Sequence, residues 1–236
     1  MPADATAIHA AVGPRSERRL RVRTLGCLPY ADALALQEAL TATIAAGTTG
    51  DQLLLLEHPP VYTLGRGADA ADLLGAPARL GVPVYRVGRG GGVTFHGPGQ
   101  MIGYPIVRLR AAGRDVHRYV RTLEAALIAV CAHFGVRASA PPGQTGVWAD
   151  GGKIGSIGIG VRRGVTSHGV ALNVTTDLSY FTHIVPCRTS GLTVTSLERL
   201  LGSPPPLAEV GRVFAACFAA QMGFAGVDIA GAEVSG

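Results

Sequence analysis

The chain has 236 residues, of which 47% are hydrophobic and 16% are charged, which suits one compact domain of generous size. Its formal net charge of +5 favours acidic partners. Its dispersed basic residues and its low aromatic content of 6% argue against a base-stacking nucleic-acid module. No apolar run reaches the roughly 18–20 residues of a membrane span. Because residues 1–14 also lack the pattern of a secretory signal, we expect a cytoplasmic protein.

The hydrophobic pattern divides the chain into three parts. Residues 1–17 contain alanine, proline and charge without periodicity, and we expect them to form a disordered leader. Residues 18–224 hold the periodic segments without a dividing linker, so we expect a single domain there. Residues 225–236 are expected to be a weakly structured tail.

Within the domain, short apolar runs bounded by turn residues predict strands, and a period of 3.6 residues predicts helices. Strands are predicted over 20–25, 52–57, 61–64, 82–87, 101–109, 147–149, 154–161 and 165–174. Helices are predicted over 31–46, 69–74, 115–134, 195–201 and 207–222, the fourth from the capping-box pattern Thr195-Ser196-Leu197-Glu198. Strands and helices alternate irregularly, with several hairpins. We therefore expect an α/β fold with a mixed sheet.

A glycine-rich run, RGGGVTFHGPGQ, occupies residues 89–100. Glycine lets a backbone lie directly against a ligand, and Arg89 and His96 add polar groups at either end of the run. The run matches neither the phosphate-binding P-loop nor the dinucleotide fingerprint. On its own, it is equally compatible with a hairpin that carries a surface arginine.

Lys153 is the only lysine in the chain, beside 20 arginines. On a solvated surface arginine replaces lysine at little cost, but arginine stays protonated in proteins and cannot act as a base. A lone lysine among glycines, just before the apolar run 154–161, is therefore a candidate for chemistry. The alternative is that Lys153 was retained by chance and contributes only its positive charge.

The four cysteines show no zinc-site spacing, and structural disulfides are not expected in the cytoplasm. Cys131 and Cys217 lie on apolar helix faces and Cys27 lies between leucines, so we expect all three to be packing residues. Cys187 differs, because it follows a proline and precedes Arg188 in a polar loop that favours the thiolate. Cys187 and Lys153 together suggest a nucleophile and its base.

Several motifs together resemble the lipoyl(octanoyl) transferase family. In chain order they are EHPPVYTLGR, RGGGVTFHGPGQ, GGKIGSIGIGVRRG, SHGVALNV, VPCRTSG and TSLERLLG, and the resemblance covers about residues 18–223. The resemblance implies the fold of the biotin/lipoate protein ligase catalytic domain, a single α/β (α+β) domain with a mixed, largely antiparallel sheet flanked by helices. It also implies that the domain over 18–224 is a catalytic acyltransferase domain.

The implied activity is transfer of an octanoyl group from octanoyl-acyl carrier protein to a specific lysine of a lipoyl domain, the first step of endogenous protein lipoylation. Cys187 stands at the acyl-accepting cysteine of the family and Lys153 at the lysine that activates it. His96 and His168 are expected to orient substrate or backbone rather than to act as the base. The residues that match the family's substrate-binding segments are Arg89, Gly90, Gly91, Gly92, Val93, Thr94, Phe95, His96, Ser156, Ile157, Gly158, Gly169, Val170 and Ala171.

The resemblance also implies the partners. The donor is octanoyl-acyl carrier protein, and the acceptors are apo lipoyl domains of 2-oxoacid dehydrogenases and the glycine cleavage H protein. We expect a monomer that requires no metal or cofactor and has no nucleic-acid or membrane partner.

Three alternatives remain open at the level of sequence. An ATP-dependent lipoate or biotin protein ligase would use a lysine in a similar segment but has no need of Cys187. A non-catalytic module that binds carrier proteins would form no adduct. A basic RNA-binding protein would show a steep salt dependence of its RNA affinity.

Overall fold

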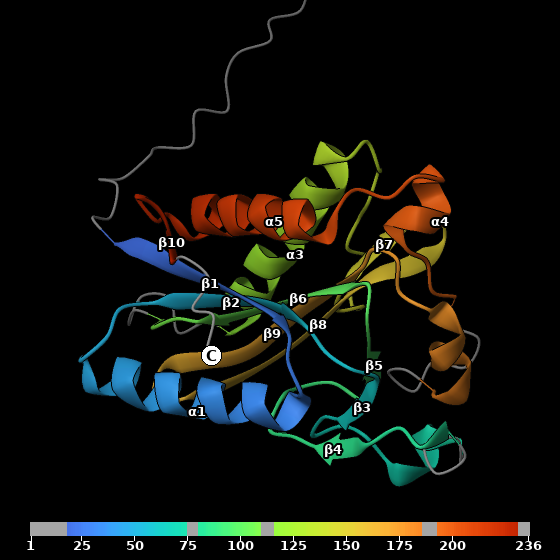
Figure 1. Ribbon diagram of the computed structural model, residues 1–236, viewed down its shortest axis with the longest axis horizontal. Helices are drawn as coiled ribbons and strands as arrows, with labels where there is room; N and C mark the ends of the chain where they lie inside the picture. The colour runs from blue at the N-terminus through green and yellow to red at the C-terminus, as the bar shows by residue number, and fades with distance from the viewer. Residues whose placement is uncertain (1–17, 75–79, 110–115, 186–192, 231–236) are drawn as a thin grey trace, which may run out of the picture.

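The computed structural model describes residues 18–74, 80–109, 116–185 and 193–230. In this part of the chain, two sheets are flanked by helices, as Figure 1 shows. The expected α/β class is therefore confirmed. Among the described residues, no helix is long and apolar enough to cross a membrane.

The described strands form a seven-stranded sheet and a three-stranded sheet. In the large sheet β10, β1 and β2 are parallel, whereas β2, β6, β9, β8 and β7 follow one another in antiparallel pairs. Its strands are β1 (Arg19–Cys27), β2 (Gln52–Glu57), β6 (Gln100–Ile106), β7 (Val147–Ala149), β8 (Gly152–Arg162), β9 (Val165–Asn173) and β10 (Gly226–Ala230). The small sheet has the order β4 (Val84–Arg86), β3 (Val61–Leu64) and β5 (Val93–His96).

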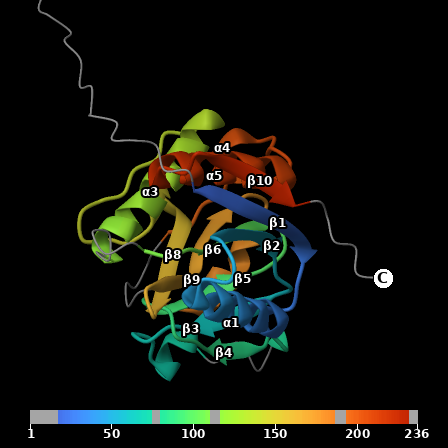
Figure 2. The same cartoon turned by 90° about the vertical axis from the view of Figure 1, so that its left-hand side faces the viewer.

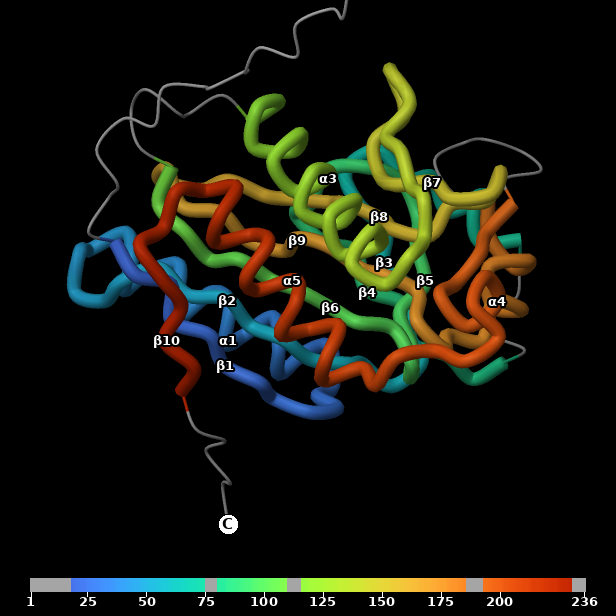
Figure 3. Tube along the Cα trace, turned by 90° about the horizontal axis from the view of Figure 1, so that it is seen from above, coloured from blue at the N-terminus to red at the C-terminus, as the bar shows by residue number. Residues whose placement is uncertain are grey.

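Helices cover both faces of the large sheet. The helix α1 (Tyr30–Ala46) lies on one face, and α3 (Val116–His133) and α5 (Leu207–Met222) lie together on the other (Figures 1 and 3). The small sheet lies below α1, as the turned view in Figure 2 shows. The short helix α4 (Leu197–Leu201) and the 3₁₀ helices η1 (Ala70–Leu73) and η3 (Leu178–His183) complete the described elements.

The larger part of the core fills the space between the sheet and the α3–α5 pair. On α5, Phe214 and Phe218 are fully buried, and on α3 Leu123 and Leu127 are fully buried. Gly103 of β6 makes this close packing feasible, because a Cβ there would lie 2.6 Å from Cε1 of Phe214. The second core, under α1, contains Ile44, Leu54 and Ile106 among others.

The structure corrects three expectations about strands. Residues 226–230 form β10 and pair in parallel with β1, so the segment expected to be a weak tail begins with a strand. The sequence of this segment shows no apolar alternation. The segment forms a strand because it pairs with the edge of β1. β6 ends at Ile106 rather than at 109, because the backbone N–H of Arg108 turns to the Asp51 carboxylate. The strand β5 lies inside the glycine-rich run, where none was predicted.

Two local expectations were also wrong. Cys27, at the end of β1, is exposed rather than packed. The N-cap of α4 is Ser196, whose side chain accepts a hydrogen bond from the Arg199 N–H, so the predicted start at Thr195 is one residue early. The Thr195 N–H instead bonds to the Lys153 carbonyl. The predicted start of α3 at Asp115 and the leader 1–17 lie outside the described residues.

We expect Phe214→Ala to lower the free energy of unfolding by about 3–5 kcal/mol, because it leaves a cavity between α5 and β6. Urea unfolding followed by circular dichroism measures the change. Val84→Ala is the control, since Val84 is 38% exposed and should change stability by only about 0.5 kcal/mol. A cost for Phe214→Ala as small as that of the control would contradict the packing described.

Candidate active site

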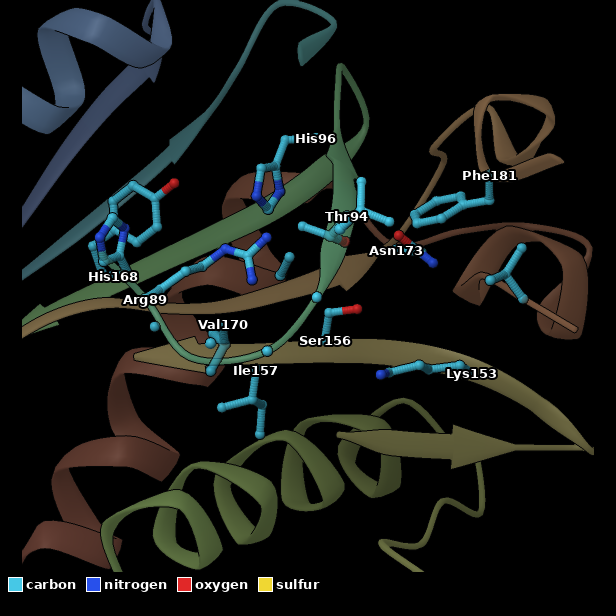
Figure 4. Close-up of a pocket in the computed structure, with 18 of the residues that line it drawn as sticks. Arg89, Thr94, His96, Lys153, Ser156, Ile157, His168, Val170, Asn173 and Phe181 are labelled. Atoms are coloured by element: carbon cyan, nitrogen blue, oxygen red, sulfur yellow. The ribbon is translucent and has the colours of Figure 1, made fainter. Parts of the chain in front are cut away.

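One pocket lies where β5, an edge strand of the small sheet, faces β8 and β9 of the large sheet, and these three strands contribute most of its wall. Figure 4 shows Lys153 at one end of it and Arg89 and His168 toward the other. Of the residues proposed from sequence, the pocket is lined by Arg89, Gly91, Gly92, Val93, Thr94, His96, Lys153, Ser156, Ile157, Gly158, His168, Gly169, Val170 and Ala171.

Two of the expected residues do not line the pocket. Phe95 is buried in an aromatic cluster, where its ring stacks on Tyr180 with a centroid distance of 4.3 Å. The alternation of a strand explains this, because Thr94 and His96 point to the pocket and Phe95 points away. Gly90 contributes a backbone bond instead, from its N–H to the Ile159 carbonyl at 2.8 Å.

The pairing of β8 with β9 brings two of the predicted segments together. Ser156 pairs with Ala171, and Gly158 pairs with Gly169. Side chains are excluded at this last pair, because a Cβ at Gly158 would lie 2.9 Å from Cδ of Arg89 and one at Gly169 would lie 2.3 Å from the Gly103 carbonyl oxygen. These glycines therefore admit the Arg89 side chain and the neighbouring strand to the site.

Arg89 is 7% exposed, so it is not the surface arginine that the sequence allowed. Its Nη2 donates to the carbonyl and to the hydroxyl of Thr63, both at 2.8 Å, and its Nη1 donates to the Gly90 carbonyl at 3.0 Å. These bonds fix a permanent positive charge at the inner end of the pocket.

Two buried histidines, His96 and His168, lie near this charge and a third, His58, lies beside His96, and all three are neutral at pH 7. Burial lowers the pKa of His58 to about 4 and that of His168 to about 4, and the charge of Arg89 lowers the latter further. Burial, followed by His58, lowers the pKa of His96 to about 3. Groups with such low pKa values are poor proton acceptors near neutral pH.

Hydrogen bonds set the tautomer of two of these rings. His58 Nδ1 lies 2.7 Å from the Leu28 carbonyl and therefore donates, which leaves Nε2 to accept from the Tyr104 hydroxyl at 2.8 Å. His96 Nδ1 lies 2.8 Å from Gln100 Oε1, and the Gln100 amide donates in turn to Asn173 Oδ1 at 2.9 Å. The Nε2 of His96 is therefore its acceptor nitrogen.

Sequence reasoning missed part of the lining. Each of these residues lies in a segment that looks like ordinary core or loop, on α1, β6, the end of β9, η3 and the loop before α4. They are Tyr30, Tyr104, Asn173, Phe181 and Val194. Asn173 carried the one available signal, as a polar residue that ends the apolar run SHGVALN.

Lys153 is 7% exposed, at the start of β8. Its Nζ donates to the Thr145 carbonyl at 3.1 Å and lies 5.0 Å from the centroid of the Trp148 ring. Its backbone N–H donates to the Thr193 carbonyl at 2.8 Å. The amine is thus held between β7 and the loop that leads into α4.

Cys187 lies outside the described residues, in the segment 186–192. The chain before it is fixed by a hydrogen bond from the Val185 N–H to the Asp72 carbonyl, and the chain after it is fixed by the bond between Thr193 and Lys153. Of the other cysteines, burial raises the pKa of Cys131 to about 12 and also raises that of Cys217. These two thiols are unsuited to nucleophilic attack. Among the described residues, no three His, Cys, Asp or Glu side chains could together hold a metal ion.

The buried histidines predict an acid-sensitive fold. Each is neutral when folded but takes up a proton near pH 6.5 when unfolded, so its contribution is complete above pH 6.5 and is lost as the pH falls toward about 4. The slope should be about 1.4 kcal/mol per pH unit for each histidine. Urea unfolding between pH 7 and pH 4.5 measures it.

His168→Asn should remove one histidine's share of that slope. Asparagine tolerates the positive φ of 55° at this position, so the backbone is retained. His133→Gln, at the exposed end of α3, is the control and should leave the slope unchanged. An unchanged slope in His168→Asn would mean that this ring is already protonated in the folded protein.

The comparisons with known proteins are consistent with this arrangement. The family model described as "Lipoyl protein ligase A/B catalytic domain" matches residues 29–219. A protein of Geobacter metallireducens named Octanoyltransferase is 53% identical over 84% of this chain and 92% of its own length. A second Octanoyltransferase, of Geotalea uraniireducens, is 50% identical over 81% of this chain and 87% of its own length.

Among solved structures, a bi-partite lipoate protein ligase from Thermoplasma acidophilum shares the fold. Its TM-score is 0.68 at 17% sequence identity, over 90% of this chain and 86% of that one. At this identity the likeness concerns the fold alone, whereas the sequence matches fix the family. The chain therefore belongs to the octanoyltransferases, within the family of lipoyl protein ligase A/B catalytic domains.

Proposed function

We propose that the protein moves an octanoyl group from octanoyl-acyl carrier protein to a lysine of an apo lipoyl domain, through a thioester on Cys187. The observation that carries the proposal is the buried amine of Lys153 at one end of a pocket lined largely by residues of the glycine-rich run and of β8 and β9. Membership of the octanoyltransferase family supports the substrate class.

In the first half-reaction the Cys187 thiol gives its proton to the neutral amine of Lys153. The thiolate attacks the thioester carbon of the donor, and the C–S bond to the carrier's pantetheine breaks. Protonated Lys153 returns its proton to the departing thiolate. This leaves an octanoyl thioester on Cys187 and a free carrier thiol, and general acid–base help of this kind is worth roughly 10²–10⁴-fold in rate.

In the second half-reaction the amine of the acceptor lysine attacks the octanoyl-Cys187 carbon. Lys153 accepts the proton that the attacking nitrogen loses, and Cys187 leaves as a thiolate. An amide forms on the lipoyl domain, and the proton passes from Lys153 to the Cys187 sulfur. The amine thus cycles one proton in each half-reaction, which an arginine cannot do.

The pocket between the two ends suits an extended acyl chain. Val93, Ile157 and Val170 are among the residues that line it, together with Gly91 and Gly158. His96 and His168 lie in the same lining and, because burial keeps them neutral, they can orient groups by hydrogen bonds but are weak bases. The role we assign to them is orientation, as expected from the sequence.

The partners follow from charge and from the family. A net charge of +5 steers an acidic carrier protein toward the enzyme and affects the association rate more than the affinity. The lipoate protein ligase of similar fold was solved as part of a system with an E2 lipoyl domain, which supports a lipoyl domain as acceptor. We propose 2-oxoacid dehydrogenase lipoyl domains and the glycine cleavage H protein as acceptors, a monomeric enzyme in the cytoplasm, and catalysis without a cofactor.

Mixing the protein with octanoyl-acyl carrier protein should give a single octanoyl adduct by intact mass, located at Cys187 and removed by hydroxylamine. Cys27→Ser is the matched control, because Cys27 is exposed and its loss should leave the adduct unchanged. Cys187→Ala should abolish the adduct. Absence of an adduct, or an adduct on a residue other than Cys187, would overturn the thioester mechanism.

Lys153→Arg separates proton transfer from charge, because it keeps the cation and removes the accessible proton exchange. We expect the rate of octanoyl transfer to fall by about 10²–10⁴-fold. The measurement is the single-turnover rate of adduct formation. A rate near that of the unmodified enzyme would show that Lys153 is only a cation.

An ATP-dependent ligase is the alternative function, because such ligases share this fold. Transfer from octanoyl-acyl carrier protein should proceed at an unchanged rate when ATP is absent. A strict requirement for ATP, with free octanoate as the acyl source, would favour the ligase instead.

A further inference from the structure

A buried carboxylate on α3 has no part in the mechanism above. Glu124 is 2% exposed and shares its helix face with the fully buried Leu123 and Leu127. Burying a carboxylate costs several kcal/mol unless hydrogen bonds and an opposite charge compensate it. The hydrogen bonds of this carboxylate therefore indicate which neighbouring groups it holds in place.

Both carboxylate oxygens of Glu124 are engaged. Oε1 accepts a hydrogen bond from the backbone N–H of Gly146 at 3.1 Å, and Oε2 accepts from Nη1 of Arg121, one turn earlier on the helix. Arg121 is 51% exposed, so water screens its charge much more than that of the buried carboxylate. The unscreened end of Glu124 thus faces the segment that precedes β7.

The peptide group that Glu124 holds is the same one that holds Lys153. The N–H of Gly146 and the carbonyl of Thr145 belong to one planar peptide unit, and that carbonyl accepts from Lys153 Nζ at 3.1 Å. In a trans peptide the N–H and the C=O point in opposite directions. Fixing the N–H on Glu124 therefore fixes the carbonyl on the amine.

Gly146 allows this peptide to lie against the lysine. Its φ of +128° is rarely adopted by other residues, and a Cβ there would lie 2.7 Å from both Lys153 Cε and the Gly155 carbonyl oxygen. A side chain at 146 would therefore displace either the lysine or strand β8. The close contact and the two hydrogen bonds form one continuous path from α3 to the amine.

We propose that Glu124 is a positioning residue for Lys153 that acts through the Thr145–Gly146 peptide. The carboxylate directs the Thr145 carbonyl at the amine, and its negative charge polarises the peptide so that the carbonyl is a stronger acceptor. The protonated amine is thereby stabilised. The expected effect on turnover rests on the proposed catalytic role of Lys153. The interaction between Glu124, the peptide and the amine does not depend on that role.

Other groups also bear on the charge state of the amine, and the test leaves them in place. The Trp148 ring lies against Lys153, and the pocket wall carries Arg89, His96 and His168. Tyr30 and Tyr104 face the same pocket, and burial raises the pKa of both phenols. None of these residues contacts Glu124 through a described hydrogen bond.

Because Lys153 is the only lysine, its titration can be read directly. Protein labelled with ¹³C at the lysine Cε gives one lysine resonance, whose shift against pH reports the midpoint without assignment. Glu124→Gln keeps the acceptor for Gly146 and removes the charge, so the midpoint should fall by roughly 0.5–1 unit. Arg121→Gln leaves the carboxylate less compensated and should move the midpoint upward by a smaller amount.

Glu38→Gln is the matched control, since Glu38 is an exposed helical glutamate on α1 rather than on α3. It should leave the midpoint unchanged. Superimposable titrations of Glu124→Gln, Glu38→Gln and the unmodified protein would overturn the proposal, as would a shift of Arg121→Gln in the same direction as Glu124→Gln.

The octanoyl adduct separates this proposal from the function proposed above. The pH profile of octanoyl-Cys187 formation should move to lower pH in Glu124→Gln, in step with the resonance. Glu124→Ala also loses the acceptor, so its rate should fall by about tenfold while its thermal midpoint shows it to be folded. A protein that shows the resonance shift but forms no adduct would retain this interaction and refute the thioester mechanism.

Discussion

The site depends on how one amine is held inside the protein. Lys153 lies at the start of β8, its Nζ bonds to the Thr145 carbonyl, and its backbone bonds to the loop at residues 193–195. These contacts connect β7, β8 and the segment that follows Cys187. A buried amine needs such an acceptor when it is charged, and a neutral amine can keep the same hydrogen bond because it retains two N–H groups. Gly146 lets the peptide approach this closely, since a Cβ there would lie 2.7 Å from Lys153 Cε.

At the inner end of the pocket the charged group cannot lose its proton, in contrast to the amine of Lys153. There a permanent charge, Arg89, is satisfied by the Thr63 carbonyl and hydroxyl and by the Gly90 carbonyl, and the surrounding histidines stay neutral. The pocket thus runs from a group that can change its charge to one that cannot. The acyl site that we propose lies between them, among lining residues that include Gly91, Gly158 and Ile157. This difference supports our proposal that the histidines orient the substrate and that the lysine transfers protons.

The sequence predicted much of this arrangement, and its failures have physical causes. Lys153 stood out because no other lysine occurs, and the predicted strands 154–161 and 165–174 do form, with Ser156–Gly158 opposite Gly169–Ala171. Tyr30 and Tyr104 were missed because their neighbours follow ordinary helix and strand patterns, and only the tertiary fold places them at the pocket. Glu124 was missed for the same reason, since a glutamate in an amphipathic helix normally faces water. The strand β10 depends on an edge of β1 that is far away in the sequence.

In the proposed mechanism the octanoyl group rests on Cys187 between donor and acceptor, and Lys153 moves the proton. A chase experiment tests this by isolating the octanoylated protein free of donor and mixing it with an apo lipoyl domain, while intact mass follows both proteins. We expect the octanoyl mass to leave the enzyme and to appear on the lipoyl domain with matching time courses, at a rate no slower than steady-state turnover. An adduct that persists while fresh donor still supports transfer would refute the mechanism, because the thioester would then be a side product.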